Sequence, residues 1–204
     1  MTVAEPAPPR KAAVTTPAAV LTVGALAVAV NVVAGTAVAS LAIPFLFLDT
    51  LGTFFVAAAY GVRAGVLVGV VTNLVLGVTE GPTAVPFALV NAAVAVVVGL
   101  LARRRGFTLP VALAAGPVVA VLAPALGTVI AVYVFGGLTG GALDLVVLGL
   151  RQAGAAVFTA AFLPRLGANA VDKVATALLV WGLLRTLPPS LVGTVLAESG
   201  AGRG

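Results

Sequence analysis

The chain has 204 residues, of which 61% are hydrophobic and only 8% are charged. Soluble domains carry about 25% charged residues, so this composition indicates a membrane protein. Apolar stretches long enough to span a bilayer recur along the sequence, so we expect a single domain embedded in the lipid bilayer. The net charge is +5, but the basic residues flank the apolar stretches. That pattern favours a role in membrane topology and argues against nucleic-acid binding.

The sequence contains no cysteine and no histidine. This excludes thiol redox chemistry and the usual zinc sites, and it removes the commonest general base of enzymes. No phosphate-binding loop of the kind that hydrolyses ATP is present. We therefore predict that the chain is not an enzyme and holds no metal or cofactor of its own. If it drives uptake, another subunit supplies the energy.

The apolar pattern predicts an all-α integral membrane protein with six transmembrane helices, and a seventh is possible. We expect residues 1–17 to form a disordered tail, residues 18–189 the transmembrane domain and residues 190–204 a flexible tail. The second span is short, although its apolar run extends back through Phe45. The predicted spans are residues 18–41, 49–62, 64–78, 84–102, 109–135 and 169–187.

Residues 142–163 decide between six and seven spans. Their pattern is helical and ends at Pro164, but Arg151 lies in the middle. An unpaired arginine at mid-bilayer costs several kcal/mol, so we favour six spans, with this segment as an outer-surface or partly inserted helix. Arg151 and Lys173 then lie on the outer side, where they either favour an anionic group in a substrate or simply lie at the membrane interface. The basic residues place the amino terminus in the cytoplasm for either count, in a multi-pass protein of the cell membrane.

Polar side chains recur at similar depth in the predicted spans. A rise of about 1.5 Å per residue puts them in the outer half of the bilayer. Polar groups inside a membrane are expected to face the bundle interior or a wet cavity, so we predict a substrate pocket that opens to the outside. The alternatives are that each asparagine bridges two helices and that the carboxylate caps a helix. The residues are Asn31, Asp49, Thr53, Asn73 and Asn91.

The first span carries small residues at helical spacing. Ala25 and Ala29 are four positions apart, so they share one face of the helix. A face of small residues lets another helix approach closely in lipid. This face either packs inside the bundle or docks on a partner.

Three stretches resemble the substrate-binding S components of energy-coupling factor (ECF) vitamin transporters. They are Leu-Asp-Thr-Leu-Gly-Thr at 48–53, Gly-Pro-Thr-Ala-Val-Pro-Phe-Ala-Leu-Val-Asn at 81–91, and the run that starts with Asp-Lys-Val-Ala-Thr-Ala-Leu at 172 and reaches the proline at 188. The chain length, the six spans and the inward amino terminus agree with this resemblance.

The resemblance implies an S-component-like bundle that binds a vitamin or a related micronutrient. Such a subunit docks on a transmembrane coupling subunit, which two ATPase subunits drive with ATP. Ala25 and Ala29 match the small-residue docking face of the family. By position, the resemblance assigns the pocket to Asp49, Asn91, Arg151 and Asn169. The alternative function is a non-catalytic structural or assembly subunit of another membrane complex.

Overall fold

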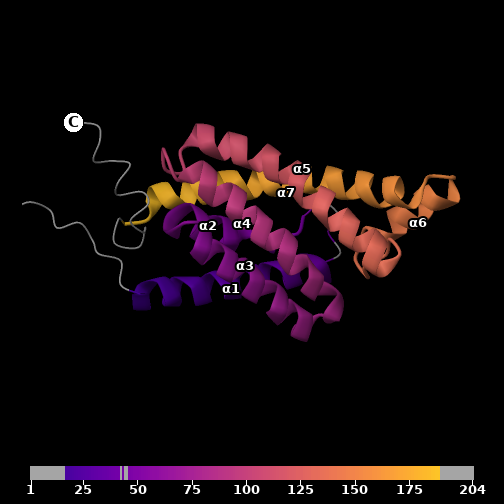
Figure 1. The fold of residues 1–204 in the computed structure, drawn as a ribbon, viewed down its shortest axis with the longest axis horizontal. Helices are drawn as coiled ribbons and strands as arrows, with labels where there is room; N and C mark the ends of the chain where they lie inside the picture. Colours follow the sequence, from indigo (N-terminus) through magenta and orange to yellow (C-terminus); the bar gives the residue numbers. More distant parts are fainter. Residues whose placement is uncertain (1–16, 42, 44–45, 189–204) are drawn as a thin grey trace, which may run out of the picture.

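The computed structural model describes residues 17–41, 43 and 46–188, and every regular element within them is a helix (Figure 1). Five of these helical stretches are long and apolar enough to cross a membrane. The described chain is therefore an all-α, multi-pass membrane bundle, which confirms the predicted fold class. The elements are α1 (Pro17–Ser40), α2 (Leu51–Tyr60), α3 (Val62–Thr79), the 3-10 helix η1 (Pro82–Phe87), α4 (Ala88–Ala102), α5 (Leu109–Phe135), α6 (Asp144–Gln152) and α7 (Val157–Thr186). The predicted tails lie outside the described residues, except that Pro17 begins α1.

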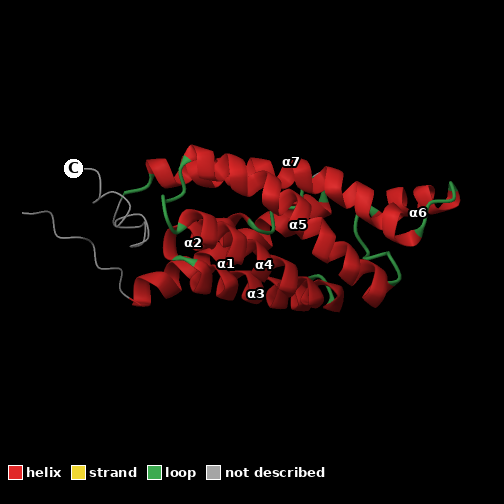
Figure 2. Ribbon diagram, turned by 45° about the horizontal axis from the view of Figure 1, so that its top comes forward, coloured by secondary structure: helices red, strands yellow, loops and turns green. Residues whose placement is uncertain are grey.

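The helices run along one long axis, so the bundle has two ends (Figure 1). We call one of them the basic end: α1, α3 and α5 begin there, and α4 and α7 end there. We call the opposite end, where α6 lies, the pocket end. In Figure 2, α5 and α7 pack side by side, while α1 to α4 form a second group against them. The basic end holds Arg63, Arg103, Arg104, Arg105 and Arg185.

Small residues bring the helices of this bundle close together. A Cβ atom on Gly65 of α3 would lie 2.5 Å from the Cβ atom of Ala57 on α2. A Cβ atom on Gly116 of α5 would lie 2.9 Å from the Cα atom of Val174 on α7. Since lipid is as apolar as leucine, close packing of this kind is a main source of helix association in a membrane. Larger side chains lie mostly on the exposed outer surfaces of the helices.

The predicted second span, residues 49–62, is wrong in its helical extent. Helix α2 has 10 residues, which is roughly 15 Å and about half of the hydrocarbon core. Residues 46–48 before it do not extend the helix, and Phe45 lies outside the described residues. Instead, residues 46–50 run back into the bundle beside α1, where Asp49 lies against Gly35. This crossing is therefore part irregular chain and part helix.

The prediction for residues 142–187 also needs correction. The expected helix that ends at Pro164 is two elements, because the chain turns between α6 and α7, where Gly154 has a φ of +89°. Helix α7 then continues through Pro164. A proline is tolerated within a transmembrane helix because neighbouring groups in the bundle satisfy the backbone groups that it leaves without partners. Helix α6 has nine residues and cannot cross a bilayer. The described chain thus has five helices that can cross a bilayer and one shorter apolar helix, α2, and Arg151 lies on exposed α6.

The close approach of α2 and α3 yields a test of the fold. In the variant Gly65→Ala, the added methyl group meets Ala57 at less than contact distance, including its backbone. Overpacking of this kind lowers the free energy of unfolding by about 1–3 kcal/mol. We expect a lower apparent melting temperature of the detergent-purified protein. The matched control is Gly182→Ala, where nothing lies within 4 Å of the new atom. Equal melting temperatures for the two variants would contradict the close approach.

Candidate functional site

A cavity of about 370 Å³ lies at the pocket end, among residues from α1, α3, α4, α5, α7 and the connecting segments. This volume is at the lower end of the range of about 300–1,000 Å³ for small-molecule sites. Apolar side chains such as Phe47 and Phe87 form part of the wall. The polar and charged lining residues are Asp49, Thr50, Asn73, Glu80, Thr83, Asn91, Thr139, Arg165, Asn169 and Lys173.

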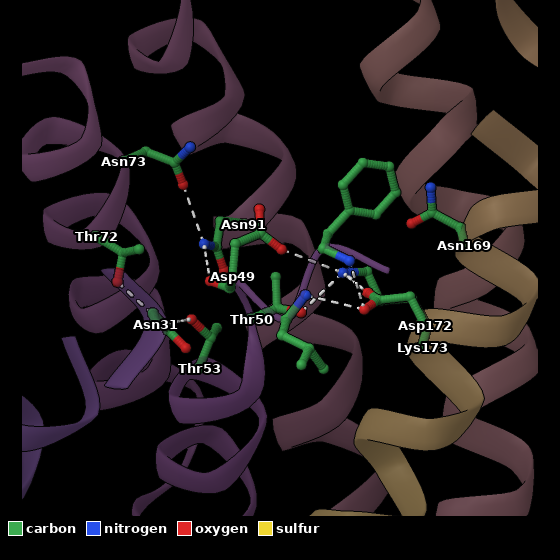
Figure 3. Close-up of polar contacts among 12 residues, drawn as sticks. Asn31, Asp49, Thr50, Thr53, Thr72, Asn73, Asn91, Asn169, Asp172 and Lys173 are labelled. Carbon is green, nitrogen blue, oxygen red and sulfur yellow. Dashed lines mark hydrogen bonds and ion pairs between the residues drawn. The ribbon is translucent and has the colours of Figure 1, made fainter. Parts of the chain in front are cut away.

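Two predicted asparagines on the cavity wall form a chain of hydrogen bonds between helices (Figure 3). The Asn91 amide donates to Oδ1 of Asn73 at 3.0 Å and to the main-chain carbonyl of Asp49 at 3.5 Å. Asn73 in turn donates to the carbonyl of Ala84 at 3.1 Å. These asparagines therefore bridge helices and line the cavity at the same time. The two interpretations of the sequence are compatible at this position.

Of the other residues predicted to bind the substrate, some line the cavity and some do not. Asp49 and Asn169 line the cavity, as expected. Asn31 and Thr53 do not, because both are fully buried beneath it. Arg151 lies on the exposed surface of α6 and is also absent from the lining. The prediction of a substrate contact is therefore corrected for these last three residues.

Asn31 joins three helices. Its Nδ2 donates to the hydroxyl groups of Thr53 on α2 and Thr72 on α3, each at 3.0 Å. Its Oδ1 accepts the backbone N–H of Gly52 at 2.6 Å. The first N–H groups of a helix have no partner within the helix, and Thr50 makes no capping bond with its side chain. An asparagine from α1 thus does what a cap residue of α2 would do.

The irregular segment before α2 is held by a charged cluster on α7. One carboxylate oxygen of Asp172 accepts the backbone N–H groups of Phe47 and Leu48, both at 2.9 Å. Lys173 lies 2.6 Å from the other oxygen of Asp172. It also contacts Asp49 at 3.4 Å and the hydroxyl of Thr50 at 2.8 Å. The carboxylate of Asp49 therefore pairs with a lysine and does not cap α2.

Sequence reasoning did not recognise Asp172 as a structural anchor, because its partners lie about 124 positions away in the chain. The available signal was an adjacent acid and base inside an apolar span. Charges within a span are costly unless they are paired, so such a pair predicts specific partners in the bundle. Which partners they are depends on how α7 packs against the segment before α2.

Arg165 lines the cavity, and the sequence did not single it out either. Its guanidinium donates to the carbonyl of Ala161 at 2.8 Å and to the hydroxyl of Thr139 at 3.2 Å. The loop that holds Thr139 is ordered by Asp144, which accepts the backbone N–H groups of Thr139 and Gly140 at 3.0 and 2.7 Å. A cation from α7 and a loop before α6 thus form one side of the cavity.

The cavity is equipped for binding through hydrogen bonds, charges and apolar contact. In the described part of the chain, no three histidine, cysteine or acidic side chains gather in a way that could hold a metal ion. A scan against models of protein families, a search of curated proteins and a search of solved structures each find no match.

The ion pair between Asp172 and Lys173 yields a test by double-mutant cycle. Asp172→Asn keeps an oxygen for the backbone N–H groups but removes the charge, and Lys173→Met removes the other charge. Each single variant leaves a buried charge without its main partner, which costs about 3–5 kcal/mol of unfolding free energy. We expect the double variant to lose clearly less than the sum of the two single losses. The readout is the apparent melting temperature in detergent, and additive losses would show that the pair does not act as a unit.

Proposed function

We propose that this chain is the membrane-embedded substrate-binding subunit of an ECF-type importer, and that it captures a vitamin or a related micronutrient. The observation that carries the proposal is the cavity at the pocket end, where polar side chains from α3, α4, α7 and the segment before α2 converge. Polar groups gathered at one depth of a membrane bundle are expected to serve a substrate or a wet cavity. The amphipathic lining suits a compact molecule with an apolar body and several polar groups.

The charge distribution supports an orientation for this subunit. Five of the described arginines lie at the basic end, opposite the cavity. Cytoplasmic loops carry an excess of lysine and arginine, so the basic end faces the cytoplasm. The amino terminus is then cytoplasmic and the cavity faces outward, in the cell membrane. This is the orientation that uptake requires.

The exposed face of α1 supports docking on a coupling subunit. Ala25 and Ala29 are both exposed, so this face does not serve the internal packing of the described chain. Another transmembrane helix can approach such a face closely. In the proposed assembly, that helix belongs to a coupling subunit, and two ATPase subunits supply the energy from ATP. A purely structural subunit could use the same face but would have no use for the polar cavity, which favours the binding subunit.

The binding function is tested by native mass spectrometry of the detergent-purified chain. The wild-type protein is expected to retain a small molecule of micronutrient size, either from the expressing cells or after incubation with vitamins and their precursors. Asn169→Ala removes a polar group of the cavity wall, so we expect weaker retention with an almost unchanged melting temperature. Losing one hydrogen bond to a ligand weakens binding by about fivefold to tenfold.

Asn31→Ala is the contrasting variant in the same experiment. It leaves the N–H of Gly52 and two buried hydroxyl groups without their partner, so we expect a loss of about 1–3 kcal/mol in unfolding free energy. The protein that remains folded should retain the ligand as the wild type does. If Asn31→Ala and Asn169→Ala have the same effects on both readouts, the distinction between the cavity wall and the helix-joining cluster is wrong.

Docking is tested with Ala29→Leu, which places a large side chain on the exposed small-residue face of α1. We expect this variant to lose co-purification with the ATPase subunits from native membranes, while its retention of the small molecule stays unchanged. The matched control is Ala114→Leu, the same substitution at an exposed position of α5. Undiminished co-purification of the Ala29 variant would exclude this face as the docking surface.

A further inference from the structure

Arg165 brings a positive charge to the cavity without a carboxylate in contact with it. Arg165 is only 6% exposed, yet it lines the cavity. Within the described part of the chain, both ion pairs belong to Lys173. The guanidinium of Arg165 donates to two neutral acceptors, the carbonyl of Ala161 and the hydroxyl of Thr139. The neighbouring Asp144 acts on Arg165 electrostatically but makes no ion pair with it, and its carboxylate accepts the backbone N–H groups that order the loop at Thr139.

A buried cation in a membrane span is costly when no anion accompanies it. Arginine has five N–H donors in a planar fork, and the fork matches the geometry of a carboxylate or a phosphate. The contacts of Arg165 with Ala161 and Thr139 use two of these donors and fix the position of the side chain. A charged, positioned donor group at the wall of a cavity is the arrangement that recognises an oxyanion.

We propose that Arg165 binds the anionic group, a carboxylate or a phosphate, of the small molecule that the cavity takes up. This proposal rests on the proposed binding function and narrows the class of substrate. It replaces the sequence-based assignment of an anionic group to Arg151 and Lys173. Arg151 lies outside the cavity, and Lys173 already contacts two carboxylates and a hydroxyl.

The opposite charge lies deeper along the same helix. Lys173 pairs with both Asp172 and Asp49, and the Asp49 side chain is 34% exposed at the cavity wall. Arg165 and Lys173 are separated by about 12 Å along α7, at about 1.5 Å per residue. Asn169 lies between them and donates to the carbonyl of Arg165 at 2.8 Å. The substrate therefore places its anionic group at Arg165 and a cationic or hydrogen-bond-donating group toward Asp49.

The test compares matched acids and neutral molecules on the full-length, detergent-purified chain. The probes are nicotinate with nicotinamide, pantothenate with pantothenol, and pyridoxal phosphate with pyridoxal, together with the small-molecule fraction of an extract of the expressing cells. Retained molecules are identified and their affinities ranked by native mass spectrometry. We expect the retained molecule to be an acid and its neutral counterpart to bind at least about tenfold more weakly, as for the loss of a charge-assisted hydrogen bond.

Three variants complete the test. Arg165→Gln should weaken retention of the acid by at least about tenfold, and Arg165→Lys, which keeps the charge but loses the fork, should fall between it and the wild type. Arg104→Gln, the same substitution at an exposed arginine of the basic end, should retain the acid like the wild type. Melting temperatures report whether each variant is folded. The comparison of acid with neutral molecule uses the wild type and stands even if Arg165→Gln does not fold.

The possible outcomes separate this proposal from the binding function. If the retained molecule has no anionic group, or if folded Arg165→Gln holds the acid as tightly as the wild type, the role of Arg165 is refuted while the binding function stands. If the wild type retains no small molecule from the extract or from the panel, the binding function fails, and this proposal fails with it. If the molecule lost from Arg165→Gln is a phospholipid, the arginine binds a lipid headgroup, which contradicts its role in binding a solute.

Discussion

The carboxylate of Asp172 is the group on which the arrangement of the pocket end depends. It accepts the N–H groups of Phe47 and Leu48 and lies beside the ammonium group of Lys173. Lipid offers no hydrogen bonds, so irregular backbone at membrane depth is stable only where protein groups satisfy it. Because Asp172 does so, residues 46–50 can enter the bundle without forming a helix. That path brings Asp49 to the cavity wall.

The same requirement explains why polar side chains in this bundle have two different roles. Deep in the bundle, Asn31 satisfies the first turn of the short helix α2 and joins it to α1 and α3. Nearer the pocket end, Asn73 and Asn91 bond to each other and still line the cavity. A polar group in a span is stabilised by any suitable partner, so residue type alone does not separate a structural asparagine from one that can bind a ligand. Depth relative to the cavity makes that separation.

Charge is distributed along α7 in a way that suits directional binding. The charge of Lys173 is compensated by two carboxylates of the protein, whereas Arg165 contacts only neutral acceptors. An internal ion pair holds the framework, and a cation without a carboxylate in contact suits the proposed binding of an external anion. The small residues at the helix contacts, such as Gly116 against Val174, keep α5 and α7 close enough to hold these groups in place.

The sequence by itself determined the membrane class, the helical fold and the span at 109–135, because a long apolar stretch has no other stable form in lipid. It also predicted that residues 142–163 do not cross the bilayer and that Asp49, Asn73 and Asn91 belong near one cavity, to which the family resemblance added Asn169. Only the tertiary structure decided where α2 begins, that α7 continues through Pro164, that Asn31 and Thr53 lie beneath the cavity, and that Arg165 lines it. The physical reason is that apolarity is a property of each stretch of chain. The partner of a polar group, in contrast, is set by packing between segments as far apart as Phe47 and Asp172.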